Sequence, residues 1–244
     1  MSVLIVSGTG TDVGKTIATG ALAACATGRV AVVKPVQTGV AEGEPGDLAE
    51  VTRLAGVTDV HEYARFPEPL SPHQAAARAG AAHLELGNVA QAIRDLHRDR
   101  DLVIVEGAGG LLAPFAPFPR AWTVLDLALL LQAPVLVVTQ AGLGTLNHTA
   151  LTMTAIAAAG AQVAGIVIGS WPDEPDTAAR LNVADLAAMA DGGALAGALP
   201  AGMAQMKDFA THARAALAPQ FGGTFDWAAF SAVQTAALTT GAHA

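Results

Sequence analysis

Residues 8–16 read GTGTDVGKT and have the composition of a loop that binds phosphate. Glycines let successive backbone N–H groups turn toward an anion, and the alanine-rich stretch that follows predicts a helix whose N-terminus favours negative charge. In such a loop Lys15 reaches the β and γ phosphates and Thr16 holds Mg²⁺. The spacing departs from the common GxxxxGKS/T pattern, because Thr9 stands five residues before Gly14 and the nearest earlier glycine is Gly8. We predict a variant phosphate loop for Mg²⁺ and a nucleoside triphosphate.

Two acidic residues are candidates for holding the metal. Glu106 follows an apolar run in DLVIVEGAGG. An acidic side chain at the end of a buried strand beside a phosphate loop commonly binds Mg²⁺, directly or through water. A solvent-facing strand cap is the alternative. Asp47 ends the acidic segment EGEPGD, where Glu44 could take the same role. By its position alone, Asp47 fits capping of the helix that starts at Leu48 equally well.

Lys34 follows the apolar run 30–33, although the chain has only three lysines against ten arginines. A lysine without a specific function usually extends from the surface of a helix. At the exit of a buried strand beside the first one, the Lys34 side chain would emerge near the γ-phosphate end of the loop. Its compact ammonium suits a small anion better than a guanidinium does. We predict that Lys34 is a point charge for a small anion, with an incidental strand-end lysine as the alternative.

The elements that position these residues alternate along the chain. Short runs rich in valine, isoleucine and leucine are separated by alanine-rich stretches with helical character, which predicts a mostly parallel β-sheet with helices on both faces. The predicted strands are residues 3–6, 30–33, 102–105, 135–138, 164–168 and, more weakly, 194–199. Loops are predicted at residues 39–46, 67–72 and 171–176. The fold class is therefore α/β, a single P-loop NTPase-like domain over residues 1–244, with no clear assignment after about residue 205.

Composition limits the classes of partner. The net charge is −8, hydrophobic residues make up 52% and charged residues 14%, as in a compact enzyme with strands buried on both faces. The one local cluster of basic residues, at positions 94, 98 and 100, fits the solvated end of a helix. We therefore expect no nucleic acid and no anionic membrane as partners.

Cysteine usage and the hydropathy pattern indicate the compartment. The single cysteine, Cys25, lies among alanines and leucines, where a small buried hydrophobe is expected and a nucleophile is not. The most apolar stretch, residues 124–138, is interrupted by Asp126, Gln132 and Pro134. We expect a soluble, cytoplasmic protein.

Three segments and their order along the chain are specific enough to compare with known families: GTGTDVGKT at 8–16, VVKPVQTG at 32–39 and VEGAGG at 105–110. With them the chain closely resembles the dethiobiotin synthetases, and LSPHQAA at 70–76 and LGTLNHTALT at 143–152 are also similar to segments of that family. The resemblance covers roughly residues 1 to 205. It implies an ATP-dependent cyclising ligase in which 7,8-diaminononanoate and CO2 (or bicarbonate) give a carbamate. Mg-ATP then phosphorylates the carbamate, and a cyclic urea closes as phosphate leaves.

The resemblance also implies roles for individual residues. In the catalytic set, Lys34 would hold the carbamate, Thr11 would line its junction with the γ-phosphate, and Lys15 would stabilise phosphoryl transfer. Thr38 would bind the substrate beside Lys34. Because a carbamate and a triphosphate repel each other, such a site needs cations at both ends and a metal between them. The implied Mg²⁺ ligands are Thr16, Asp47 and Glu106.

Further implied contacts involve the nucleotide and the far end of the substrate. The nucleotide-binding residues would be Asp12, Val13, Gly14, Lys15, Thr16, Ile17, Asp47, Glu106, Gly107, Ala108, Gly109, Gly169, Ser170, Pro200, Ala201 and Gly202. The substrate carboxylate would be bound at a helix start by Gly144, Thr145, Leu146 and Asn147. In the family this segment belongs to the neighbouring subunit, so the resemblance implies a homodimer with shared active sites. Capping of the helix by Thr145 and Asn147 remains an alternative or additional role. His73 and His148 are expected to pack or cap.

Two departures from the family pattern concern the nucleotide. Where members often carry Asn-Asp after the fifth predicted strand, this chain has Gly169, Ser170 and Trp171. A glycine side chain cannot bond to a base edge, whereas a tryptophan could stack on a base. Base choice therefore stays open between ATP and another triphosphate such as CTP. Gly10 also replaces an aspartate that is frequent in the family.

Other functions of related folds fit the sequence less well. Partitioning and septum-positioning ATPases usually carry a second lysine near the start of the phosphate loop, where this chain has Thr9 and Gly10. Amide-forming ligases of the cobyrinate or CTP synthase kind usually add a glutaminase domain with a catalytic cysteine. The chain is too short for that domain, and Cys25 has the wrong context. A degenerate nucleotide-binding regulator is disfavoured because all the expected cationic residues and metal ligands are present.

Overall fold

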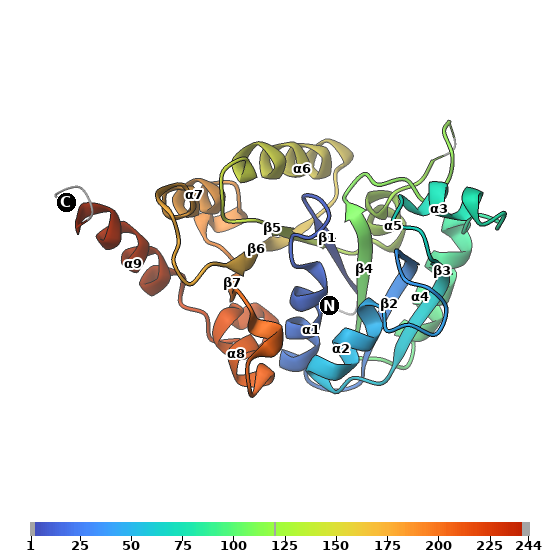
Figure 1. Cartoon of the computed structure of the whole chain (residues 1–244), viewed down its shortest axis with the longest axis horizontal. Helices are drawn as coiled ribbons and strands as arrows, with labels where there is room; N and C mark the ends of the chain where they lie inside the picture. Colours follow the sequence, from blue (N-terminus) through green and yellow to red (C-terminus); the bar gives the residue numbers. More distant parts are fainter. Residues whose placement is uncertain (1–2, 120, 241–244) are drawn as a thin grey trace.

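A computed structural model describes residues 3–119 and 121–240, so the ends of the domain expected over 1–244 lie outside the described residues. In this range one parallel sheet runs through the molecule in the order β3-β2-β4-β1-β5-β6-β7 (Figure 1). The strands are β1 (Val3–Gly8), β2 (Val30–Thr38), β3 (Val60–Phe66), β4 (Leu102–Gly110), β5 (Val135–Thr139), β6 (Val163–Trp171) and β7 (Gly197–Pro200). The predicted α/β class is confirmed.

Helices cover both faces of this sheet. The α-helices are α1 (Lys15–Cys25), α2 (Asp47–Ala55), α3 (Pro72–Arg78), α4 (Leu86–His97), α5 (Val124–Leu131), α6 (Thr145–Ala159), α7 (Thr177–Ala188), α8 (Phe209–Ala216) and α9 (Trp227–Thr240). Short 3₁₀ turns are η1 (Asp191–Gly193), η2 (Met203–Gln205) and η3 (Pro219–Phe221). One core lies between the sheet and α3 to α7, and the other lies between the sheet and α1, α2 and α8. Figure 1 shows α9 beside α7, at the end of the molecule opposite β3.

The order of the strands explains where a site forms. The chain leaves β1 toward β2 on one side, and later leaves the adjacent β4 toward β5 on the other side. Loops that follow neighbouring parallel strands in opposite directions leave a crevice at the carboxyl edge of the sheet. The phosphate loop follows β1 and Glu106 lies on β4, so the two predicted binding elements meet at this crevice.

Several predicted strands are longer in the structure, and one was missed. β2 and β4 continue past their apolar runs, so Lys34 and Glu106 lie within strands and not after them, a correction to the sequence reading. Beyond Val33 the pairs of β2 with β4 end, while its pairs with β3 continue to Thr38. β3 itself was not predicted, because it is an edge strand, VHEYARF, with charged residues and little buried surface.

The most apolar stretch of the sequence is divided between two elements. Thr123 and Asp126 form a capping box at the start of α5, and Gln132 adopts a left-handed conformation after its end. β5 then begins at Val135, after Pro134. In the described part of the chain, no helix is both long enough and apolar enough to cross a membrane.

Candidate active site

The phosphate loop packs its backbone tightly against the end of β6. Gly14 has a left-handed backbone conformation, with φ of 93°, and α1 begins directly after it without a side-chain cap. A Cβ on Gly169 would lie 2.0 Å from the Val13 carbonyl oxygen, and one on Gly14 would lie 2.4 Å from the Gly169 carbonyl oxygen. Only glycines fit at this crossing. The N–H groups at the start of α1 are therefore free to bind an anion.

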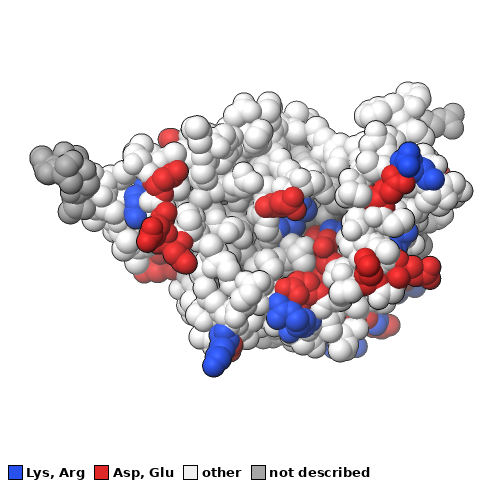
Figure 2. All heavy atoms as spheres, viewed as in Figure 1, with Lys and Arg blue, Asp and Glu red and all other residues white. Residues whose placement is uncertain are grey.

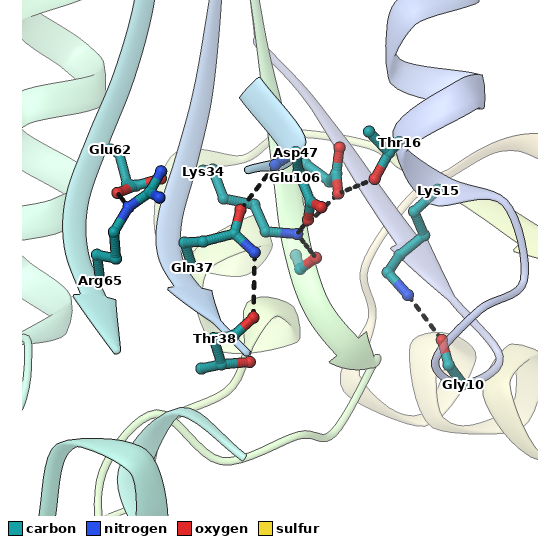
Figure 3. A network of polar contacts seen from close by, with 11 residues as sticks. Gly10, Lys15, Thr16, Lys34, Gln37, Thr38, Asp47, Glu62, Arg65 and Glu106 are labelled. Atoms are coloured by element: carbon teal, nitrogen blue, oxygen red, sulfur yellow. Dashed lines mark hydrogen bonds and ion pairs between the residues drawn. The ribbon is translucent and has the colours of Figure 1, made fainter. Parts of the chain in front are cut away.

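Lys15 turns back across this loop. Its Nζ donates a hydrogen bond of 2.7 Å to the Gly10 carbonyl, which Figure 3 shows at the tip of the loop. Burial lowers the pKa of the Lys15 ammonium, and the nearby Lys34 ammonium lowers it further, to about 8. The environment thus disfavours the positive charge, and an anion bound in the loop would relieve this.

Lys34 joins the two predicted acidic residues in one buried cluster. Its Nζ lies 2.7 Å from Glu106 Oε1 and 2.6 Å from Asp47 Oδ2, and it donates a bond of 3.2 Å to the Gly107 carbonyl. The Thr16 hydroxyl donates a bond of 3.0 Å to the same Glu106 oxygen. Figure 3 shows these side chains converging from β2, β4, α1 and the start of α2. Lys34 is 4% exposed and Glu106 is 0% exposed.

Lys34 and its acidic neighbours stabilise one another in their charged forms. Burial alone would lower the pKa of Lys34, but Glu106 and Asp47 outweigh it, so the pKa lies above its usual value. Burial likewise acts to raise the pKa of Asp47, and the ion pair with Lys34 outweighs it and holds that pKa below its usual value. Lys34 therefore stays an ammonium and Asp47 a carboxylate at neutral pH.

Asp47 and Glu44 make different contacts. Asp47 is the first residue of α2, and the helix has no side-chain cap, so its carboxylate does not cap the helix but pairs with Lys34. Glu44 instead accepts a hydrogen bond from the Ala41 N–H within its own loop. Glu106 is buried and is not a solvent-facing cap.

The donor set fits Mg²⁺. The second oxygen of Glu106, Oε2, is buried and has no hydrogen-bond partner among the described residues, which leaves a strong acceptor unused. Within the described residues no group of three or more His, Cys, Asp or Glu side chains is arranged to hold a metal. Mg²⁺ commonly needs fewer, because it binds one or two carboxylates and takes its other ligands from water and phosphate. Asp47, Glu106 and the Thr16 hydroxyl supply such a set.

Two adjoining cavities lie along the phosphate loop. One, of about 420 Å³, is lined by Lys15, Thr16, Lys34, Asp47 and Glu106 among others. The other, of about 830 Å³, extends away from the loop toward α3 and α6. The residues that line both are Thr11, Asp12, Thr38, Ala108 and Gly109. Acidic side chains rim a depression on this face of the molecule, and basic atoms are visible inside it (Figure 2). A polyanion and a second small molecule could therefore meet beside Thr11 and Thr38.

The predicted base-binding residues come together at the ends of β6 and β7. Trp171 pairs with Pro200, and the Ala201 N–H donates a bond of 2.7 Å to the Trp171 carbonyl. Gly169, Ser170 and Trp171 lie within β6, whereas Trp171 was predicted to start a loop. Three residues of β6 there span the length of two in β7, and such an irregularity redirects side chains. The Trp171 ring packs edge-on against Phe230 of α9, at 5.1 Å between centroids.

The segment Gly144 to Asn147 forms the start of α6 with no side-chain cap. The capping alternative for Thr145 and Asn147 is therefore wrong. Thr145 instead donates to the Gln140 carbonyl and contacts the Thr139 hydroxyl. The α6 residues that line the larger cavity of the same chain come later in the helix, among them His148, Leu151 and Thr152. His148, expected only to pack or cap, thus lines a cavity.

Sequence reasoning missed two polar residues beside the cluster. Gln37 accepts a hydrogen bond of 2.9 Å from the Asp47 N–H, and Arg65 of β3 donates to carbonyls of the loop that precedes Asp47. Gln37 lies in the quoted segment VVKPVQTG, where a buried glutamine next to Thr38 was a usable signal. Arg65 lies in the strand that was not predicted.

Comparisons with known proteins agree with this architecture. A protein-family model described as AAA domain matches residues 2–203. A curated protein of Saccharopolyspora erythraea named "ATP-dependent dethiobiotin synthetase BioD" is 54% identical over 91% of this chain and 98% of its own length. Proteins of the same name from Parafrankia sp. and Streptomyces coelicolor are 56% and 51% identical, each over 94% of this chain and 98% of their own. The chain belongs to the ATP-dependent dethiobiotin synthetases, a family of ligases.

Proposed function

We propose that this protein carboxylates 7,8-diaminononanoate with CO2 and closes the cyclic urea of dethiobiotin, using a nucleoside triphosphate and Mg²⁺. The observation that carries the proposal is the pair of adjoining cavities that share Thr11 and Thr38 on their linings, with the buried Lys34 lining the smaller one. One cavity offers a phosphate loop and a metal-binding set, and the other offers room for an elongated diamine. The relatives' names support the overall reaction.

The residues of the cluster suit successive roles. One amine of the substrate takes up CO2 to form a carbamate, whose negative charge Lys34 would stabilise beside Thr38. A bound Mg²⁺ would neutralise charge on the triphosphate, with Thr16, Asp47 and Glu106 as its protein ligands. Lys15 would exchange its bond to the Gly10 carbonyl for phosphate oxygens and stabilise phosphoryl transfer to the carbamate oxygen. The second amine then attacks the carbamoyl carbon, the urea ring closes and phosphate leaves.

A second copy of the chain is part of the proposal. Leu143 and Leu151 of the α6 region are 91% and 63% exposed, and Leu112, at the larger cavity, is 57% exposed. Such exposed leucines beside a cavity are typical of a protein interface. The uncapped start of α6 would then offer its N–H groups to the carboxylate of a diamine bound in the partner's cavity. We propose a homodimer with shared active sites, acting in the cytoplasm.

The carboxyl end of β6 bears on which nucleotide base the protein accepts. Because Gly169 contacts the loop backbone and has no side chain, hydrogen bonds to the base would come from backbone groups near Ser170 and Ala201 to Gly202. Because position 169 has no side chain that could select adenine, we propose that CTP and other triphosphates serve as well as ATP.

Phosphate release by the purified protein tests the function. With 7,8-diaminononanoate, bicarbonate, Mg²⁺ and a panel of nucleoside triphosphates, we expect release that requires both the amine and bicarbonate. A Lys34→Gln variant should bind nucleotide but scarcely turn over. Phosphate release that is independent of the diamine, or full activity of Lys34→Gln, would contradict the proposal.

A further inference from the structure

We propose that Arg65 and Gln37 are positioning residues that hold the acidic loop 39–46 against the sheet and thereby set the carboxylate of Asp47 for the metal. The inference rests on the proposed function, because it assigns Asp47 to Mg²⁺. It concerns Gln37 of β2 and Arg65 of β3, whose hydrogen bonds within the described residues go to neither the phosphate loop nor Glu106. Figure 3 shows both side chains on the β3 side of Lys34.

Arg65 connects the edge strand to the loop. Its Nε and Nη2 donate bonds of 2.7 and 2.9 Å to the two carboxylate oxygens of Glu62. Its Nη1 donates to the carbonyls of Ala41, at 3.2 Å, and Glu44, at 2.6 Å. The carboxylate of Glu62 fixes the plane of the guanidinium, and the remaining nitrogen then reaches two points of the loop. A lysine cannot reproduce this arrangement, because it has a single nitrogen.

Gln37 connects the loop to the site. Its Oε1 accepts from the Asp47 N–H at 2.9 Å, and its Nε2 donates to the Thr38 carbonyl at 3.1 Å. The side chain is 3% exposed, so both bonds are shielded from water. Gln37 and Arg65 are also register partners across β2 and β3. The two side chains therefore act on the same short segment from adjacent positions.

Gly46 shows how closely the loop passes these side chains. A Cβ at Gly46 would lie 2.8 Å from Gln37 Oε1 and 3.0 Å from Arg65 Nη2. Residues 42–45 are exposed, so burial of apolar surface contributes little to holding the loop. Its conformation depends instead on these hydrogen bonds. Asp47 follows directly, with Oδ2 2.6 Å from Lys34 Nζ.

The loop conformation thus determines where the Asp47 carboxylate lies. Groups that orient a metal ligand typically contribute 10- to 100-fold to metal affinity or activity. We expect Arg65→Ala to loosen the loop and weaken metal binding, with little effect on nucleotide bound without metal. Arg65→Lys keeps the charge but not the geometry, and should fall between Arg65→Ala and the wild type. Gln37→Leu should resemble Arg65→Ala.

Binding of Mn²⁺ in the presence of ATP, followed by electron paramagnetic resonance, tests this without the diamine. We expect about 10-fold weaker Mn²⁺ binding or more in Arg65→Ala, and a matching rise in the Mg²⁺ concentration for half-maximal turnover. The kcat at saturating Mg²⁺ should change less than twofold. Arg100→Ala is the matched control, because Arg100 forms a similarly half-buried pair with Asp59 away from the site.

The outcomes separate the two proposals. Mn²⁺ affinity of Arg65→Ala within twofold of the wild type, or an equal loss in Arg100→Ala, would overturn the positioning role. If Arg65→Ala does not fold, Arg65→Lys decides by the same criterion. A wild type that binds Mn²⁺ and ATP but does not turn over the diamine would refute the proposed function and leave the effect of Arg65 on the metal measurable.

Discussion

Removing the ammonium of Lys34 should destabilise the folded protein, apart from any effect on catalysis. Lys34→Met keeps an unbranched side chain one atom shorter but deletes the charge that lies 2.7 Å from Glu106 and 2.6 Å from Asp47. Glu106 is 0% exposed and would then be a buried carboxylate without a counter-ion, whereas Asp47 is partly exposed and can be hydrated. Breaking a buried ion pair by removing one partner costs about 3–5 kcal/mol. For a domain of this size that corresponds to a melting temperature lower by roughly 10 °C.

Urea unfolding without added metal, followed by tryptophan fluorescence, measures this cost. The midpoint should fall while the m-value stays unchanged. Glu106→Gln combined with Lys34→Met removes both charges, and the double variant should recover to within about 2 kcal/mol of the wild type because neutral pairs replace buried ion pairs at little cost. Lys207→Met, at an exposed lysine, is the control. A loss in Lys34→Met no larger than in this control, or losses that simply add in the double variant, would refute the reasoning.

Other predictions test packing and reactivity. Gly169→Ala should lower the unfolding free energy by about 1–3 kcal/mol and weaken nucleotide binding, because its Cβ meets the Val13 carbonyl. Gly10→Ala is the control and should unfold like the wild type, because a Cβ there has nothing within 4 Å among the described residues. Equal urea midpoints for the two variants would contradict this prediction. Burial raises the pKa of the Cys25 thiol, so a disulfide reagent at pH 8 should label this thiol slowly in the native protein and quickly in urea. Rapid labelling of the native protein would show that the thiolate is accessible. Trp171→Ala should lower the unfolding free energy by about 2 kcal/mol, because the contact with Phe230 is lost. The order in which the nucleoside triphosphates support turnover should stay unchanged. A changed order would indicate that Trp171 stacks on the base.

Much of the fold could be predicted because its central strands are buried on both faces. β1, β4 and β5 each begin with a continuous apolar run, and their alternation with helices leaves few arrangements other than a parallel sheet. β3 lacked that signal, since at the edge of the sheet its residues are only partly buried. The ends of β2 and β4 were also predicted too early. The apolar pattern stops at the polar residues Lys34 and Glu106, although the hydrogen-bonded strands continue beyond them.

The residues of the candidate site were also predictable only in part. The phosphate loop and Glu106 follow from local spacing, since strand, loop and helix are adjacent in the chain. The link from Asp47 to Lys34 depends on how an irregular loop returns to the sheet, which no periodic pattern reports. Arg65 and Gln37 were missed for a related reason. Their importance comes from register across two strands, one of which the sequence did not reveal.

The contact between the phosphate loop and β6 has a consequence for protein engineering. Since Gly169 lies against the backbone of the loop, an amide side chain cannot be introduced there without moving the loop as well. A larger residue at position 169 therefore needs compensating changes in a segment more than 150 residues earlier in the chain. An exchange of Gly169 alone would disturb the loop before it added a useful side-chain contact.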